Sequence, residues 1–196
     1  MLRVLPWITD GATNFLDGFI ANNLRTSTKV FEFGLGNSTL YFLSRDCHVT
    51  GVEHDEKWFN LISSSAKVFE YEKLQISLGS RPYFDAYSTN EFDVISIDGR
   101  DRVLCLKKVL QMGLKDTSII VLDNTERISG FGGRYEDYTL LLEGMNVMHF
   151  EQPYIQGLDP AISSFPDRAG HRVNHRWITT IAFNASINYT SLGKVL

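Results

Sequence analysis

The sequence contains little cysteine and no long apolar run. Its 196 residues include two cysteines, Cys47 and Cys105, which lie within apolar segments and not at metal-ligand spacing. This pattern predicts buried free thiols in a reducing compartment and argues against a disulfide framework. No window approaches the roughly 18 apolar residues of a membrane-spanning helix, and the N-terminal apolar run is too short for a signal peptide. We therefore expect a cytoplasmic protein that has no membrane partner.

The sequence also lacks an excess of charge of one sign. The formal net charge is −4 and charged residues make up 21% of the chain. Proteins that bind duplex nucleic acid usually carry a basic excess, so we expect no nucleic-acid partner. The 43% of apolar residues can supply one sizeable core, which predicts that residues 1–196 form a single domain.

Short apolar runs alternate with longer segments of helical period, a pattern typical of an α/β fold with a mostly parallel sheet. Strands are expected at 29–33, 48–53, 74–78, 92–97, 118–122, 146–151 and 177–183. Helices are expected at 13–24, from 39 or 40 to about 45, and at 55–70, 103–112 and 135–145. The segment 1–28 then precedes the sheet, and the long connection 152–176 is expected to be a lid or substrate loop.

A Gly-x-Gly pair, Gly34 and Gly36, follows the first expected strand. Glycine lets a ligand approach the main chain closely, and Asn37 and Ser38 can cap the helix that follows. Glu53 ends the second strand 19 positions after Gly34, close to the spacing of about 20 at which a carboxylate reaches ribose hydroxyls. We interpret this segment as a site for an adenosine-containing cofactor. The structural alternative is a turn-forming glycine pair with a carboxylate that caps a helix.

Two residues help to distinguish the candidate cofactors. The dinucleotide fingerprint has a third small residue at position 39, where this chain has Thr39. Glu32 beside the loop would repel a pyrophosphate, but it suits the sulfonium and ammonium groups of S-adenosylmethionine. Both residues favour S-adenosylmethionine, and an NAD(P)-dependent oxidoreductase is the alternative.

Three segments, 32–39, 51–55 and 92–98, resemble the class I S-adenosylmethionine-dependent methyltransferases. The resemblance covers roughly residues 29–124. It implies an α/β, Rossmann-like, doubly wound and mostly parallel seven-stranded sheet, with an antiparallel last strand and helices on both faces. It also implies an enzyme that transfers methyl from S-adenosylmethionine to a small-molecule acceptor, with oxygen as the expected atom. A cofactor-binding module without catalysis is a second alternative.

The resemblance assigns roles to individual residues of this chain. The methionine moiety would face the first strand and its loop, at Glu32, Gly34, Gly36, Asn37 and Ser38. The ribose would bind Glu53, and the adenine would lie near His54 and Ser80. Asp98 would stand where methyl donor and acceptor meet.

Oxygen-bearing side chains also follow the fourth and fifth strands, at Asp98 and at the pair Asp123 and Asn124. Mg²⁺ prefers oxygen ligands, and the arrangement resembles the cation-dependent, catechol-type O-methyltransferases. That resemblance implies a Mg²⁺ ion held by these residues, which would lower the pKa of an acceptor hydroxyl. Where that group has a lysine, this chain has Asp101, a candidate general base. The alternative for Asp101 is a helix cap with surface ion pairs.

Substrate contacts are expected from segments above the same strand ends, at 7–10, 126–134 and 152–176, with the glycine-rich stretch 130–133 as a gate. The basic residues of the last segment favour an acidic or phosphorylated acceptor: Arg168, His171, Arg172, His175 and Arg176. The alternative for this segment is a solvated loop or a subunit contact of a homodimer.

Overall fold

The structure is a computed structural model that describes residues 5–22, 27–69, 71–126, 135–153 and 176–185. The strands are β1 (Lys29–Phe33), β2 (His48–Glu53), β3 (Leu74–Leu78), β4 (Val94–Ile97), β5 (Ile119–Leu122), β6 (Met145–Pro153) and β7 (Arg176–Asn184). The α-helices are α1 (Asp10–Asn22), α2 (Asn37–Leu43), α3 (Glu56–Ser65), α4 (Arg102–Met112) and α5 (Tyr135–Leu141). Three short 3₁₀ turns occupy Ala66–Val68, Tyr71–Lys73 and Phe84–Ala86. A strand is present at each of the seven predicted positions.

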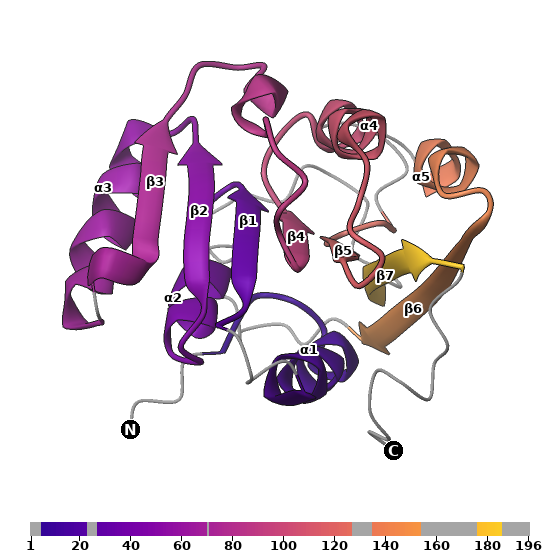
Figure 1. The fold of residues 1–196 in the computed structure, drawn as a ribbon, viewed down its shortest axis with the longest axis horizontal. Helices are drawn as coiled ribbons and strands as arrows, with labels where there is room; N and C mark the ends of the chain where they lie inside the picture. Colours follow the sequence, from indigo (N-terminus) through magenta and orange to yellow (C-terminus); the bar gives the residue numbers. More distant parts are fainter. Residues whose placement is uncertain (1–4, 23–26, 70, 127–134, 154–175, 186–196) are drawn as a thin grey trace.

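The strands form one sheet in the order β3-β2-β1-β4-β5-β7-β6 (Figure 1). The first five strands pair in parallel, whereas β7 runs antiparallel to β5 and β6. This confirms the predicted Rossmann-like sheet with an antiparallel last strand.

Helices cover both faces of the sheet. Every residue of β4 and β5 is buried, as expected of parallel strands covered on both sides. One core packs α1 and α2 against Val30, and the other packs α4 and α5 against Phe31 and Phe33 (Figure 1). Because side chains alternate along a strand, Glu32 points to the same face as Val30, toward α2.

Several predicted helix boundaries are wrong. The helix α1 begins at Asp10 instead of residue 13, and α3 ends at Ser65 instead of residue 70. The helix after the glycine pair begins at Asn37, with Gly36 in the N-cap position, so Asn37 and Ser38 lie in its first turn and do not cap it. The Thr39 hydroxyl instead accepts the Gly36 N–H at 3.1 Å, one half of a capping box. The helix predicted to reach residue 145 ends at Leu141, ahead of Gly144, whose φ of +83° is a left-handed turn conformation.

Both cysteines are buried and free, as predicted. Within the described parts of the chain, no helix has both the length and the apolar character needed to cross a membrane. The gate at 130–133, the basic residues at 168–175 and most of the predicted lid lie outside the described residues.

Candidate cofactor site

The site forms where the direction of the chain connections changes, between β1 and β4. In open α/β sheets, ligands bind beyond the carboxyl ends of strands at such a switch point. The N–H groups of Asp98 and Gly99 both donate to the Phe33 carbonyl, at 3.0 and 2.7 Å. Gly34 adopts φ +89°, and a Cβ atom there would lie 2.4 Å from the Gly99 Cα. The close packing of these two loops places Asp98 beside the glycine pair.

Gly36 differs from Gly34 in what surrounds it. Its φ of −169° is extended and open to any residue. A Cβ atom there would meet only the Ser38 Oγ at 3.8 Å and the Trp58 Nε1 at 4.0 Å. Gly34 is therefore required by packing within the protein, whereas the main chain at Gly36 has space in front of it.

Glu32 is a buried carboxylate without a hydrogen-bond partner. Its exposed fraction is 0%, and neither carboxylate oxygen is bonded. Burial raises the pKa of Glu32 to about 7. The nearby Thr39 and Ser38 hydroxyls favour the charged form, although neither completes a hydrogen bond to it. Because an unpaired buried carboxylate is costly, a cationic ligand that donates hydrogen bonds would stabilise this site.

Glu53 has the opposite character, since its carboxylate is already bonded. Its Oε2 accepts the Leu35 N–H at 3.0 Å. Its Oε1 accepts the N–H groups of His54 and Asp55 at 2.7 and 2.9 Å. Glu53 therefore ties the end of β2 to the glycine loop, in addition to the predicted ribose contact.

The residues predicted near an adenine lie beside an aromatic pair. The His54 ring stacks on Tyr83, with centroids 5.6 Å apart and planes 24° apart. The Tyr83 hydroxyl accepts the Arg100 N–H and donates to the Arg100 carbonyl at 2.9 Å. Ser80 is exposed on the loop after β3. Tyr83, which sequence reasoning missed, links this loop to the end of β4.

Asp101 is held by an arginine. Arg81 donates to it through Nε at 2.8 Å and through Nη2 at 2.5 Å. This pair holds the pKa of the Asp101 carboxyl below its ordinary value, which makes the carboxylate a weaker base. The ion pair expected as the structural alternative is present, and the side-chain cap is absent. The role of general base stays a prediction.

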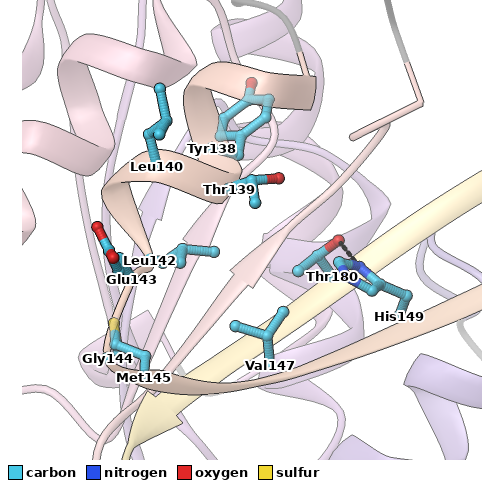
Figure 2. Close-up of a pocket in the computed structure, with 10 residues that line it drawn as sticks. All are labelled: Tyr138, Thr139, Leu140, Leu142, Glu143, Gly144, Met145, Val147, His149 and Thr180. Carbon is cyan, nitrogen blue, oxygen red and sulfur yellow. Dashed lines mark hydrogen bonds between the residues drawn. The ribbon is translucent and has the colours of Figure 1, made fainter.

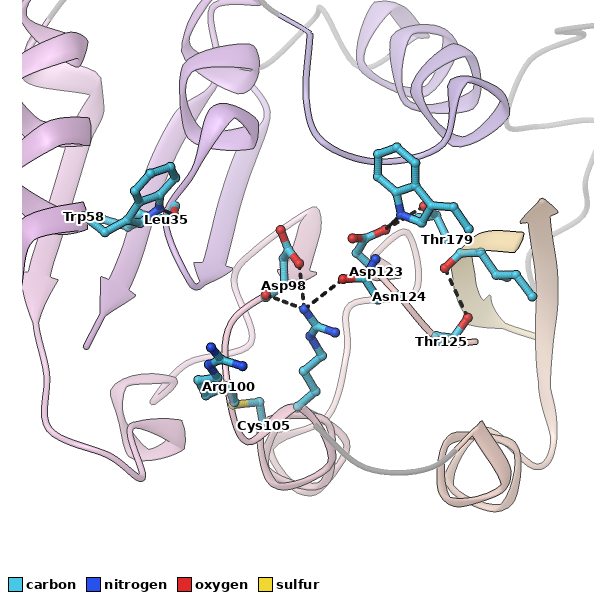
Figure 3. A network of polar contacts seen from close by, with 12 residues as sticks. Leu35, Trp58, Asp98, Arg100, Cys105, Asp123, Asn124, Thr125 and Thr179 are labelled. Carbon is cyan, nitrogen blue, oxygen red and sulfur yellow. Dashed lines mark hydrogen bonds and ion pairs between the residues drawn. The ribbon is translucent and has the colours of Figure 1, made fainter. Parts of the chain in front are cut away.

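Two of the three predicted metal ligands, Asp98 and Asn124, contact a buried guanidinium. Arg102 is 4% exposed. Its Nη2 donates to the Asp98 carbonyl at 2.7 Å, to the Asp98 Oδ1 at 2.9 Å and to the Asn124 Oδ1 at 3.3 Å (Figure 3). Sequence reasoning assigned no role in the site to Arg102. Its position four residues after Asp98, at a helix start, was the available signal.

Asp123, the residue before Asn124, is held by side chains of β7. Its Oδ1 accepts from the Trp177 Nε1 and the Thr179 Oγ1, both at 2.9 Å. Burial and the neighbouring Asp98 raise the pKa of Asp123 well above its ordinary value, and Arg102 opposes this shift. Among the described residues, no group of three or more His, Cys, Asp or Glu side chains is placed to hold a metal ion.

Two tryptophans flank the glycine loop, and their role was also missed. The Trp58 Nε1 donates to the Leu35 carbonyl, and the Asp55 carboxylate caps the helix at the Trp58 N–H. The Trp7 ring packs on Trp58 with centroids 5.8 Å apart. Trp7 belongs to the segment 7–10 that was predicted to contact the substrate, so the structure brings that segment beside the loop.

A separate hollow of about 420 Å³ lies between α5 and the strands β6 and β7 (Figure 2). Apolar side chains line it together with His149, whose Nδ1 lies 2.9 Å from the Thr180 Oγ1. It contains none of the predicted site residues, so it is distinct from the cofactor site.

The chain was compared with known proteins. No protein-family model matches it, and no curated protein matches its sequence. Solved structures do match. An S-adenosylmethionine-dependent O-methyltransferase from Thermotoga maritima is 10% identical, with a TM-score of 0.60 over 95% of this chain and 70% of that one.

Two further matches have different acceptors in their names. A precorrin-6Y C5,15-methyltransferase from Geobacter metallireducens is 12% identical, with a TM-score of 0.57 over 94% of this chain and 92% of that one. The N-methyltransferase NodS from Bradyrhizobium japonicum is also 12% identical, with a TM-score of 0.56 over 89% and 94%. The protein therefore has the Rossmann-like fold of the class I S-adenosylmethionine-dependent methyltransferases.

Proposed function

We propose that this protein transfers a methyl group from S-adenosylmethionine to a small-molecule acceptor, most favourably to an oxygen atom. The observation that carries the proposal is Glu32, a fully buried carboxylate without a hydrogen-bond partner beside a glycine loop. A ligand ammonium would supply the missing donors and the missing charge. The fold is that of enzymes that use this cofactor.

The residues present fit the parts of the cofactor. Glu32 suits the ammonium group, and the open main chain at Gly36 leaves room for the methionine moiety. Glu53, at the end of β2, would bind the ribose, and the His54 ring with Tyr83 would offer an aromatic surface to the adenine. A pyrophosphate would instead bring negative charge toward Glu32, which disfavours a dinucleotide.

The chain's own residues would act mainly by positioning. The bound cofactor supplies a methyl group on a sulfonium, which an acceptor displaces in line. Asp98, whose side chain is 29% exposed at the end of β4, would accept the hydroxyl proton of an acceptor and orient its oxygen. Trp7 and Trp58 would shield the loop from water. Alignment of reactants can contribute roughly 7–11 kcal/mol to lowering the barrier.

Calorimetry with S-adenosylhomocysteine tests the cofactor assignment. The wild type should bind it, and Glu32→Gln should weaken binding about 10- to 100-fold, because a charged hydrogen bond contributes about 1.5–3 kcal/mol. Glu72→Gln is the matched control, since Glu72 is exposed and away from the loop. Binding of NAD(P) in place of S-adenosylhomocysteine would refute the proposal and favour an oxidoreductase.

Catalysis needs a second test because cofactor binding alone does not establish chemistry. Methyl transfer from labelled S-adenosylmethionine to a panel of small hydroxylated compounds should occur and should fall at least about 100-fold in Asp98→Asn. Transfer to nitrogen or carbon acceptors alone would contradict the oxygen assignment. Binding without transfer to any acceptor would favour a non-catalytic module.

A further inference from the structure

We infer that the guanidinium of Arg102 is a built-in cation that takes the place of a divalent metal ion between β4 and β5. The inference deepens the proposed function, since it concerns the same site, but its first test does not depend on that function. The sequence predicts Mg²⁺ held by Asp98, Asp123 and Asn124. The side-chain contacts of these residues argue for a different source of positive charge.

The first argument is the position of Arg102. A metal ion that joined Asp98 to Asn124 would need the space between their side-chain oxygens. One nitrogen of Arg102 already binds the Oδ1 atom of each, at 2.9 and 3.3 Å, and also binds the Asp98 carbonyl at 2.7 Å. In Figure 3 the dashed contacts of Asp98 and Asn124 meet at this nitrogen. A cation added here would displace the guanidinium or lie against its charge.

The second argument is the state of Asp123. Mg²⁺ needs ligand oxygens at about 2.0–2.1 Å in near-octahedral geometry. The Oδ1 of Asp123 already accepts two hydrogen bonds, from Trp177 and Thr179 at 2.9 Å. These bonds join β5 to β7 and fix the carboxylate. The predicted ligand set therefore does not fit a metal without rearrangement.

The third argument is the burial of the guanidinium itself. A guanidinium with a side chain only 5% exposed is costly unless acceptors compensate it. Here one carboxylate, one amide oxygen and one carbonyl oxygen accept from its Nη2, whereas its buried Nε has no hydrogen-bond partner. Arg102 therefore neutralises and orients Asp98, which makes it a positioning residue for the proposed site of methyl transfer.

Mn²⁺ binding followed by electron paramagnetic resonance tests the inference directly. Wild-type protein with Mn²⁺ should give the signal of the free ion, with or without S-adenosylhomocysteine. The affinity for S-adenosylhomocysteine should be the same in EDTA and in millimolar Mg²⁺. Binding of about one Mn²⁺ per chain, lost in Asp98→Asn, would overturn the inference, even if cofactor binding failed altogether.

Substitution of Arg102 tests its charge. S-adenosylmethionine carries a sulfonium, whereas S-adenosylhomocysteine carries a neutral thioether, so the ratio of their affinities reports the local charge. Arg102→Met should raise the preference for the sulfonium on the order of tenfold, if the charges lie about 8–10 Å apart at an effective dielectric constant of about 20–40. Arg102→Lys, which keeps the charge, should leave the ratio near that of the wild type.

The control is Lys107→Met, which removes a positive charge from an exposed position of the same helix and should not change the ratio. Equal weakening of both ligands in Arg102→Met would mean that Arg102 is only structural, and would overturn the inference. Circular dichroism establishes whether the variant folds. If it does not fold, Arg102→Lys and the Mn²⁺ experiment decide the question.

Discussion

The same substitution at the two glycines of the cofactor loop should affect different properties, the stability of the fold at Gly34 and ligand binding at Gly36. Gly34→Ala places a Cβ atom 2.4 Å from the Gly99 Cα and 2.6 Å from the Gly99 nitrogen, at a φ of +89°. Gly36→Ala places one in ordinary van der Waals contact with the Ser38 Oγ, at 3.8 Å, and at an extended φ. The first change should therefore damage the fold, whereas the second should damage binding.

The magnitudes follow from the backbone. A left-handed conformation costs an ordinary residue about 1–2 kcal/mol, and displacing the Gly99 backbone adds to this, for a total of at least about 3 kcal/mol. In a protein of 150–250 residues that lowers Tm by about 6–12 °C. Gly36→Ala should change the free energy of unfolding by about 1 kcal/mol or less, because glycine and alanine differ modestly at an N-cap.

The assay is thermal unfolding together with calorimetry of S-adenosylhomocysteine. Gly36→Ala should keep its Tm within about 4 °C of the wild type and bind the ligand at least about 10-fold more weakly. Gly34→Ala should mainly lower the Tm. Wild-type affinity in a folded Gly36→Ala protein would refute the placement of the cofactor against this loop.

Four other predictions concern charge and hydrogen bonding. Because burial raises the pKa of Glu32 from 4.5 to about 7, the stability of the ligand-free protein should be fully present below pH 4.5. It should fall by up to about 3 kcal/mol as the pH rises through 7, and Glu32→Gln should remove this dependence in urea titrations. Calorimetry in two buffers should detect release of about 0.9 proton on ligand binding at pH 6 and about 0.1 at pH 8. Asp101→Asn should cost less than about 1 kcal/mol in denaturant unfolding, because its pair with Arg81 is partly exposed. Trp58→Phe removes the bond to the Leu35 carbonyl and should lower Tm by about 2–4 °C in thermal unfolding.

The central strands could be predicted from sequence because β4 and β5 are short apolar runs, each followed by an aspartate. β1, β2 and β3 have the predicted bounds. The start of α2 could not be predicted as well. Asn37, Ser38 and Gly36 are all acceptable N-caps, and the choice depends on the Thr39 hydroxyl, which turns back to the Gly36 N–H.

The positions that depend on strand order could be predicted from the sequence. The contacts that depend on the direction of a side chain could not. Parallel strands bring their carboxyl ends to one edge, so the proximity of Asp98 to Gly34 follows from topology. Arg102 turns inward toward Asn124, 22 positions away. This direction depends on which oxygen atoms lie within hydrogen-bond distance once the chain is folded. Local sequence at a helix start does not contain that information.

The acidic residues of the candidate site differ in how many hydrogen-bond partners the protein already gives them. Glu53 accepts three main-chain N–H groups, so it shapes the loop whether or not a ligand is bound. Asp123 is bonded to two side chains of β7, which fixes it as part of the scaffold. Glu32 is fully buried and has no such partner. Burial of a charge is tolerated only when something compensates it, and the compensation for Glu32 has to come from a proton or from a bound cation. If the ammonium group of S-adenosylmethionine is that cation, as proposed, Glu32 couples cofactor binding to proton release.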